Sequence, residues 1–340
     1  MVSRVSIVGA GPAGFALAAD LQNNGKSTLL YSHETHLRHA NDVMSKGRLT
    51  LSGMMEGFSH LRLTTDMSQA VAFSKILIPT VPSTGQQTIF GRIEAIEVAN
   101  ILETNLSPYS CRMDDNNLPV FGRKKVVFIT ALRTDMRPGF YEDIQSIFPM
   151  KLKWCSSVIE VSLSNVNGVF HPAMMLMNAG RIESTAGDFM LYRDGLTRSV
   201  ANTMQAIDQV RMEIGRKFGL RLRTAVDVSN ECYDQGFTDL VDLAQNSPPH
   251  NRLKAPSDID NRNISEDVPD LLVSWHGLAE KLGIDASPIA AIIVLAEMAT
   301  GAEYRKTGRN LRKLHLDGVG RSELVAMFSP LQATQNEARL

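Results

Sequence analysis

The stretch Arg4-Val-Ser-Ile-Val-Gly9-Ala-Gly11-Pro-Ala-Gly14 decides the fold of the N-terminal half of this chain. A short apolar run, typical of a buried strand, leads directly into three glycines with the spacing G-x-G-x-x-G. An alanine-rich segment from Phe15 to about Asn24 then has the pattern of a helix, and Ser27 to Tyr31 reads as the next strand. This order of strand, turn, helix and strand is the context in which the glycine motif binds a dinucleotide.

Each glycine of the motif has its own task. Gly9 permits the tight turn, Gly11 lets the backbone approach a pyrophosphate, and Gly14 lets the helix pack closely on the strand. The N-terminus of the helix faces the anion and offers it free N–H groups and a favourable dipole. We therefore expect a nicotinamide dinucleotide at this loop rather than a glycine turn without a ligand.

The residues after the second strand bear on which dinucleotide fits. An acid that would bind the ribose hydroxyls is expected at Ser32, but a small polar residue stands there, with His33 and Arg38 after it. Such residues accommodate a 2′-phosphate better than an aspartate would. We predict NADP as the cofactor and leave NAD open, because Glu34 is close by. The missing acid also counts against an FAD site.

Histidines recur at every third position, at His33, His36 and His39. This spacing resembles that of the ligands of a metal site. No cysteine or acid stands nearby in ligand spacing, so we expect a solvated helix face and no metal.

Composition limits the possible classes of function. The 340 residues suffice for two domains, and 35 basic side chains balance 36 acidic ones, which excludes a broad basic face for nucleic acid. The 3 cysteines are odd in number and far apart, which favours a reducing compartment over a disulfide framework. The longest apolar run, Ile289 to Leu295, is too short to cross a bilayer, and the N-terminus shows no signal peptide. We expect a soluble cytoplasmic protein without membrane or nucleic-acid partners.

The pattern of apolar residues changes along the chain. Residues 75–82 and 125–130 read as further buried strands, which together with the intervening helices predict a doubly wound sheet. From about Pro172 the apolar residues fall at helical intervals, in residues 174–182, 196–218, 239–244 and 271–282. The sequence thus predicts an α/β protein: a Rossmann-type nucleotide-binding domain over residues 1–165, followed by an all-α helical domain over residues 166–340.

One segment of the chain carries an obvious candidate for proton transfer. Asn165-Val-Asn167-Gly-Val-Phe-His171-Pro172 combines an imidazole with side-chain amides. Proline suits the first turn of a helix, where a backbone N–H has no partner, so we expect His171 at a helix start, pointing into a cleft. Further on, a polar stretch from Gln245 to Asn263 predicts a surface loop that covers a cleft.

Taken together, these segments resemble the opine dehydrogenase family, which includes the octopine and nopaline dehydrogenases. The resemblance covers most of the chain and rests on blocks at residues 103–112, 163–172, 178–183, 192–197, 262–269 and 301–309. The chain departs from the family pattern at Gly168, where a proline is expected. Compared with relatives, we also expect it to lack a strand–helix unit of the nucleotide domain between Asp66 and Glu103.

The resemblance implies a reaction and residue roles. Family members join the amino group of an amino acid to a 2-keto acid and reduce the resulting imine with NAD(P)H, in a site between the two domains. By position in the matching blocks, His171 would be the acid/base group, Asp267 would orient it, and Arg262 would hold a substrate carboxylate. Asn165 and Asn167 would contact the substrate. These residue types suit the chemistry, since histidine exchanges protons near neutral pH and the arginine fork matches a carboxylate.

Two alternatives stay open from the sequence. One is an NAD(P)-dependent dehydrogenase of related layout that acts on a 2-hydroxy acid or keto acid without an amine. The other is a protein that binds NADP(H) as a sensor and has no turnover. A requirement for an amino acid co-substrate separates the first from the opine reaction, and absence of turnover marks the second. The identity of the two substrates and the oligomeric state, with a homodimer as one option, are not fixed by the sequence.

Overall fold

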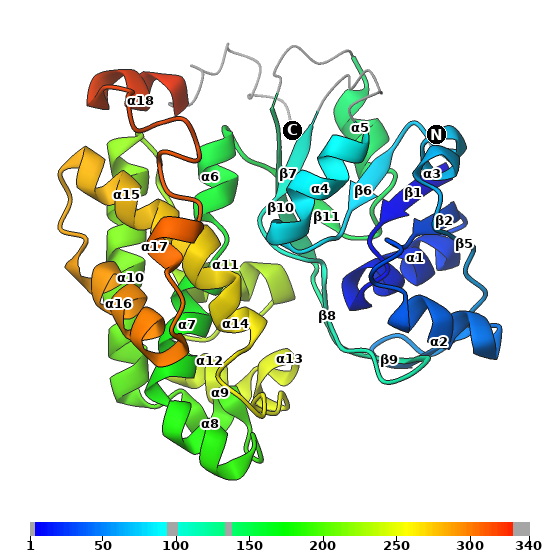
Figure 1. Cartoon of the computed structure of the whole chain (residues 1–340), viewed down its shortest axis with the longest axis horizontal. Coiled ribbons are helices and arrows are strands. Elements are labelled where there is room, and N and C mark those ends of the chain that lie inside the picture. The colour runs from blue at the N-terminus through cyan, green and yellow to red at the C-terminus, as the bar shows by residue number, and fades with distance from the viewer. Residues whose placement is uncertain (1–3, 94–100, 133–137, 329–340) are drawn as a thin grey trace.

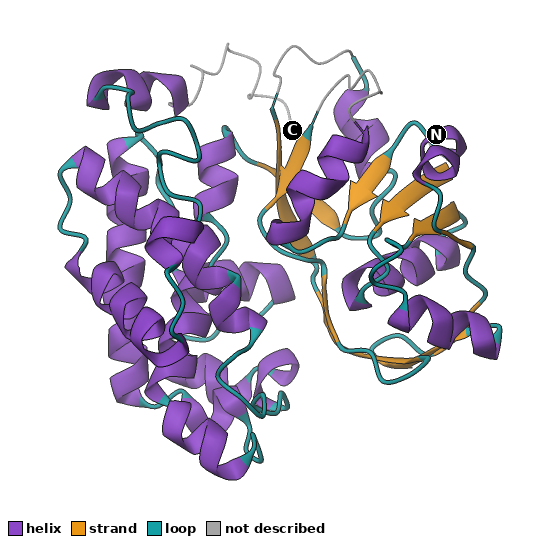
Figure 2. Ribbon diagram, in the orientation of Figure 1, coloured by secondary structure: helices purple, strands orange, loops and turns teal. Residues whose placement is uncertain are grey.

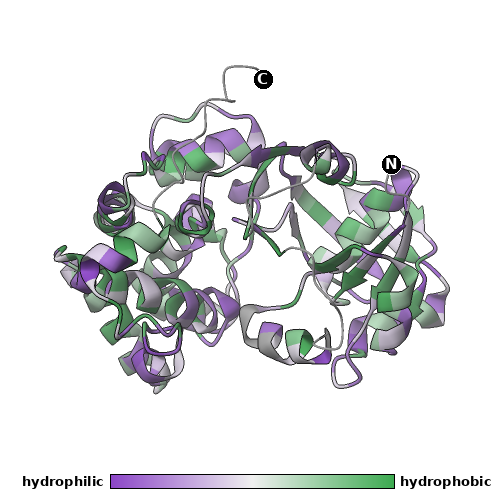
Figure 3. Cartoon of the chain, turned by 90° about the horizontal axis from the view of Figure 1, so that it is seen from above, coloured by the Kyte–Doolittle hydropathy of each residue, from purple (hydrophilic) through white to green (hydrophobic). Residues whose placement is uncertain are grey.

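The molecule has two parts that lie side by side, one built of strands and helices and the other of helices (Figures 1 and 2). The structure is a computed structural model that describes residues 4–93, 101–132 and 138–328. Hydrophobic residues gather inside each part, as the view from above shows (Figure 3). Each part has its own buried core, which is the expected arrangement for two packed domains.

The N-terminal part begins with the expected Rossmann-type unit. Four parallel strands lie in the order β5-β2-β1-β6, with β1 at Arg4–Val8, β2 at Ser27–Tyr31, β5 at Leu63–Thr64 and β6 at Leu77–Pro79. The helices of this unit are α1 (Pro12–Asn23), α2 (Arg38–Lys46), α3 (Met67–Phe73) and α4 (Ser83–Ile93). Apolar side chains of β1 and of α1 are fully buried against each other, so the strand–turn–helix interpretation of the glycine motif is confirmed.

Within the described residues, the other strands form two further sheets. One has the order β11-β10-β7, with β7 at Leu102–Thr104, β10 at Val126–Ala131 and β11 at Lys151–Trp154. The other has the order β4-β3-β9-β8, with β3 at Leu49–Gly53, β4 at Gly57–Ser59, β8 at Tyr109–Cys111 and β9 at Asn117–Arg123. The strand expected over residues 125–130 thus belongs to a separate, mixed sheet, which lies beyond β6 in Figure 1. Helix α5 (Phe140–Gln145) precedes β11.

The C-terminal part is helical, as expected. Its elements are α6 (Val158–Leu163), α7 (Asn167–Met177), α8 (Ala179–Thr185), α9 (Leu191–Gly195), α10 (Arg198–Lys217), α11 (Ala225–Tyr233), α12 (Leu240–Asn246), α13 (Pro248–Asn251), α14 (Arg262–Ser265), a π-helical turn (Val268–Leu272), α15 (Val273–Leu282), α16 (Ser287–Thr300), α17 (Tyr304–Thr307) and α18 (Arg321–Phe328). None of the described helices is long and apolar enough to cross a membrane.

The start of α7 differs from the prediction. The helix begins at Asn167, so Pro172 lies inside it and His171 lies in its second turn. An interior proline costs about 3 kcal/mol, because it removes a hydrogen bond and crowds the preceding turn. Burial outweighs this cost, since most residues from Gly168 to Leu176 are buried in the helical core. The helix expected over residues 174–182 is interrupted at Asn178, whose side-chain amide donates to the carbonyl of Met174.

Candidate active site

The three positions of the first glycine loop differ in why they need glycine. Gly9 has φ 129°, and a Cβ on it would lie 2.8 Å from Oγ1 of Thr80. A Cβ on Gly14 would lie 1.9 Å from the carbonyl oxygen of Gly9. At Gly11, by contrast, no atom lies within 4 Å of where a Cβ would be, although this residue is the N-cap of α1. The fold therefore requires Gly9 and Gly14, whereas Gly11 leaves open space at a helix N-terminus, the place where a pyrophosphate binds.

The residues after β2 form a tight turn. The Ser32 side chain is buried, and its hydroxyl donates to the carbonyl of His36 over 3.1 Å. The Thr35 hydroxyl lies 2.8 Å from Nδ1 of both His33 and His36. The expected helix face is therefore wrong for these two histidines, because local hydrogen bonds hold them in a turn and only His39 lies in α2.

Two of the residues expected to bind the cofactor differ in their exposure. Nε2 of His33 is buried without a hydrogen-bond partner in the described part of the chain, whereas Arg38 is exposed in the first turn of α2.

Glu34 is the acid because of which NAD was kept as an alternative cofactor. Its carboxylate binds an arginine of α4. Both carboxylate oxygens accept from Arg92, over 2.9 and 3.1 Å, and the same guanidinium donates to the hydroxyl of Tyr31. This hydrogen-bonded guanidinium lowers the pKa of Glu34 to about 2. The carboxylate is thus neutralised by a fixed partner, a contact that sequence reasoning missed because Arg92 is far from Glu34 in the chain.

His171 and Asp267 meet although 96 residues separate them. Nδ1 of His171 lies 2.6 Å from Oδ2 of Asp267, a short, charge-assisted contact. Their side chains are 19% and 13% exposed, so the pair is sheltered but still reachable. Asp267 directly precedes the π-helical turn, an irregularity that often marks functional sites.

The remaining predicted substrate residues lie in three different settings. The Arg262 side chain is 72% exposed and lies 3.4 Å from Glu266, and within the described residues it forms no hydrogen bond or ion pair with His171. The side chain of Asn165 accepts from the backbone N–H of Asn167, which makes it part of a turn. Asn167 lines a small cavity of about 50 Å³ and is the one of the three that faces an internal space.

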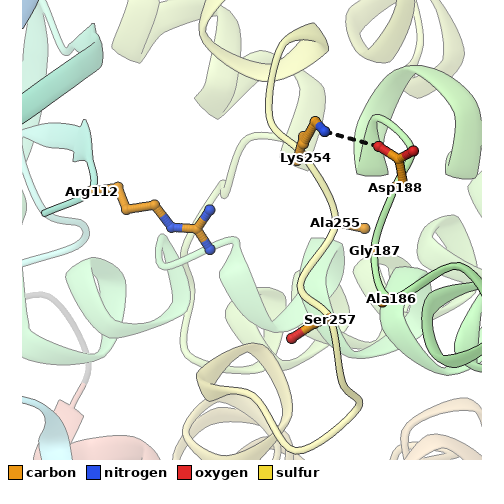
Figure 4. A pocket seen from close by; sticks show the side chains of 7 residues that line it. All are labelled: Arg112, Ala186, Gly187, Asp188, Lys254, Ala255 and Ser257. Atoms are coloured by element: carbon orange, nitrogen blue, oxygen red, sulfur yellow. Dashed lines mark hydrogen bonds and ion pairs between the residues drawn. The ribbon is translucent and has the colours of Figure 1, made fainter. Parts of the chain in front are cut away.

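A more open cavity of about 290 Å³ lies elsewhere (Figure 4). Arg112 projects toward it from the end of β8, and the ion pair between Lys254 and Asp188 borders it on the other side, with 2.9 Å between the charged atoms. None of the predicted site residues lines this cavity, so we do not place the chemistry there.

Comparison with known proteins shows which families this chain is similar to. A family model described as NAD/NADP octopine/nopaline dehydrogenase, alpha-helical domain, matches residues 154–300. A second model, described as NAD-dependent glycerol-3-phosphate dehydrogenase N-terminus, matches residues 4–102. The chain is similar to the opine dehydrogenases over nearly its whole length. This similarity supports an NAD(P)-dependent oxidoreductase activity.

Individual relatives of this family match along nearly their whole length. An opine dehydrogenase of Arthrobacter sp. (strain 1C) is 26% identical over 346 residues, which cover 92% of this chain and 95% of that protein. The vitopine synthase of Allorhizobium ampelinum is 24% identical over 358 residues, covering 95% and 98%. A solved octopine dehydrogenase with NADH and L-arginine shares the fold, with a TM-score of 0.72 at 14% identity and coverage of 96% and 98%.

Proposed function

We propose that this opine dehydrogenase homologue catalyses the reductive condensation of an amino acid with a 2-keto acid. The observation that carries the proposal is the 2.6 Å contact between His171 and Asp267, because it joins an acid/base group to an orienting carboxylate. We keep the division into a nucleotide-binding domain (residues 1–165) and a substrate domain (residues 166–340) as part of the proposal.

In this proposal the two ring nitrogens of His171 have separate tasks. Asp267 accepts the hydrogen of Nδ1, which fixes the tautomer and leaves Nε2 for the substrate. Nε2 first takes a proton from the substrate ammonium group, so that the free amine attacks the keto carbon. The attacking nitrogen passes one proton to the former carbonyl oxygen, and Nε2 then returns its proton to the resulting hydroxyl, which departs as water and leaves a protonated imine. When bound, the dinucleotide supplies the hydride that reduces the imine to a secondary amine.

The structural relatives support the choice of substrates. The solved octopine dehydrogenases are described as complexes with NADH and L-arginine, with NADH and agmatine, and with NADH and pyruvate. An amino acid and a short 2-keto acid are therefore the substrate classes that we propose for this chain. The amino acid and the keto acid themselves are left to the experiment.

We also propose that NADP is preferred. Ser32 offers no charge against a 2′-phosphate, and Arg92 neutralises Glu34 and contributes positive charge at the end of β2. Replacing Ser32 by Asp should shift preference toward NADH by at least tenfold, through repulsion of the phosphate. Fluorescence titrations of both reduced dinucleotides measure this, and a native preference for NADH would contradict the cofactor assignment.

The reaction itself is tested by a substrate matrix. Oxidation of NADPH and NADH is followed with a panel of amino acids, each combined with pyruvate, 2-oxoglutarate or glyoxylate. We expect oxidation only when an amino acid and a keto acid are both present. Oxidation with a keto acid alone would instead indicate a 2-hydroxy acid dehydrogenase. Tight binding of NADPH without oxidation in any combination would indicate a sensor.

A further inference from the structure

A buried lysine, Lys124, lines a small cavity together with residues of α7, the helix that carries His171. Lys124 directly follows β9 and is only 7% exposed. Burying an ammonium group is costly unless an anion or several acceptors compensate it. The burial of Lys124 therefore needs a compensating interaction.

The partners of Lys124 do not neutralise its charge. Its Nζ donates to the carbonyl of Ser107 over 2.6 Å and lies 5.1 Å from the ring centre of Tyr233. These contacts occupy one of three donors and one face of the ammonium group. Throughout residues 4–93, 101–132 and 138–328, the structure shows no carboxylate paired with Lys124.

The cavity beside Lys124 has room for the missing anion. This cavity of about 50 Å³ holds a few non-hydrogen atoms, which suits a carboxylate but not a whole amino acid. Asn167 and Phe170 of α7 line it together with Tyr192, Tyr233 and His250. The wall thus combines amide and imidazole groups with aromatic surface, so that a charged head and an adjacent apolar group both find contacts.

His250 does not compete for the anion as a second cation. Burial, then the nearby charges of Lys124 and His171, lower its pKa to about 3. Its Nδ1 lies 2.6 Å from the hydroxyl of Ser247, and its ring packs against Tyr192 and Tyr233. Lys124 is therefore the positive group of this cavity at neutral pH.

Two observations place the cavity at the proposed active site. Asn167 and Phe170 lie on the same helix as His171, and Phe170 is its direct neighbour in sequence. In addition, Lys124 and Arg262 both lie close enough to Cys111 to oppose the increase in the pKa of this thiol that burial causes. The two cations thus flank one region at the junction of the domains.

We propose that Lys124 binds one of the two substrate carboxylates in this cavity, while Arg262 binds the other. The inference rests on the proposed function, because the product of condensing an amino acid with a 2-keto acid carries two carboxylates. A single arginine clamp leaves one of them without a counter-charge. The buried ammonium group beside His171 supplies it.

The experiment compares Lys124→Met with native protein, each saturated with NADPH. Affinities for glyoxylate, pyruvate, 2-oxoglutarate and the panel of amino acids are measured by calorimetry, and KM values where turnover occurs. We expect Lys124→Met to weaken one substrate class at least tenfold and to leave the other class and NADPH within twofold. Arg262→Gln should weaken the opposite class. Lys124→Arg should restore part of the lost affinity, since it keeps the charge.

Two controls guard against a structural effect. Lys125→Met removes an exposed neighbouring charge and should behave as native protein. Without substrates, Lys124→Met should be at least as thermally stable as native protein, because an apolar side chain of similar length replaces an uncompensated ammonium group. If that variant fails to fold, native protein still provides a test: pyruvate should raise its melting temperature and the uncharged pyruvamide should not.

Several results would overturn the inference. They are unchanged affinities in Lys124→Met, equal losses for both substrate classes, or no binding of any carboxylate by native protein. The proposed function fails separately. Selective, Lys124-dependent binding without NADPH oxidation would retain the site and reject the reaction. Oxidation that does not depend on Lys124 would retain the reaction and reject the site.

Discussion

At the scale of single residues, the proposed catalytic role of His171 rests on its hydrogen bond to Asp267. An imidazole that is fixed at Nδ1 presents Nε2 in one direction, and the carboxylate behind it stabilises the ring when it carries a proton. Partial exposure of both side chains lets a substrate reach the ring while most bulk water is kept away. These are the physical requirements for general acid/base catalysis.

The first prediction concerns this pair. Positioned proton transfer is typically worth about a hundred- to ten-thousandfold in rate, so His171→Ala should lower kcat by that order while NADPH affinity stays native. Asp267→Asn should do much the same, because an amide favours the wrong tautomer. The double variant should be scarcely worse than either single variant, since members of one unit are not additive. Losses that simply multiply, or full activity in either variant, would show that the pair is structural.

A second residue-scale prediction concerns pH. The pKa of His250 is lowered to about 3 in the folded protein, first by burial. Below about pH 6.5 the unfolded chain takes up a proton at this residue, whereas the folded chain does not until about pH 3. The contribution of neutral His250 to the free energy of unfolding is therefore complete above pH 6.5. It is lost as the pH falls from about 6.5 to about 3.

The variant His250→Gln removes this dependence. Urea unfolding at pH 7 and at pH 4.5 should show native protein losing about 2–3 kcal/mol more than the variant between the two conditions. Equal losses would mean that His250 does not titrate as described.

The residues that sequence reasoning found and missed differ in one physical respect. The loop from Gly9 to Gly14 was predictable, because its chemistry is local and its spacing is diagnostic. The pairing of Glu34 with Arg92 was not predictable, since nothing in a single sequence indicates which distant arginine an acid will meet. Lys124 was missed for the same reason: its burial becomes visible only when β9 and α11 lie together.

At the scale of elements, the glycines explain how closely helices and loops approach. A Cβ on Gly168 would lie 2.9 Å from the Trp275 ring, so α7 and α15 pack together only because no side chain stands there. This gives a structural reason for glycine at the position where the family pattern led us to expect proline. A Cβ on Gly308 would lie 2.5 Å from the carbonyl oxygen of Pro269. Glycine at this position therefore lets the chain after α17 pack directly on the π-helical turn.

The third prediction uses two glycines of one loop. Gly11→Ala should leave the fold intact and change its stability by less than about 1 kcal/mol, because its φ of −96° suits alanine and nothing lies nearby, whereas alanine is a poorer N-cap than glycine. Its methyl group should nevertheless weaken NADPH binding at least tenfold, since it occupies the space of the pyrophosphate. Gly14→Ala should instead destabilise the protein by about 1–3 kcal/mol through its clash with Gly9.

Thermal unfolding and NADPH titration of both variants check this pair of outcomes. Native affinity in Gly11→Ala would remove the cofactor from this loop. The contrast matters because only a ligand explains a glycine that the fold itself does not need.

Helices and strands with long apolar patterns were predictable from the sequence. The predicted end of an element could still be wrong. The strands β1 and β2 and the helix α10 follow from local patterns. The start of α7 was misplaced, because burial of its apolar face overrides the local preference of Pro172. The meeting of α7 with Asp267 was expected only from resemblance to a family, since spacing along the chain does not encode it.

At the scale of the whole molecule, polar contacts connect the two parts around the proposed site. The side chain of Arg309 donates to Gln86 of α4 over 2.7 Å and lies 3.3 Å from Asp270 in the π-helical turn. The backbone of Lys125 donates to the carbonyl of Cys232 over 2.7 Å. The contacts of Arg309 join α4 to the π-helical turn after Asp267, and the contact of Lys125 joins the end of β9 to α11. Under the proposed function, the pair of His171 and Asp267 would lie where a hydride donor in the first domain meets a substrate held by the second.

The central claim is that this arrangement reduces an imine formed from two substrates. The most direct measurement uses NADPH that carries deuterium at the transferable position of the nicotinamide, together with the amino acid and keto acid that support oxidation. Mass spectrometry of the product should show a secondary amine with two carboxylates and one deuterium on the former keto carbon. A deuterated 2-hydroxy acid, formed equally well without the amino acid, would contradict the account.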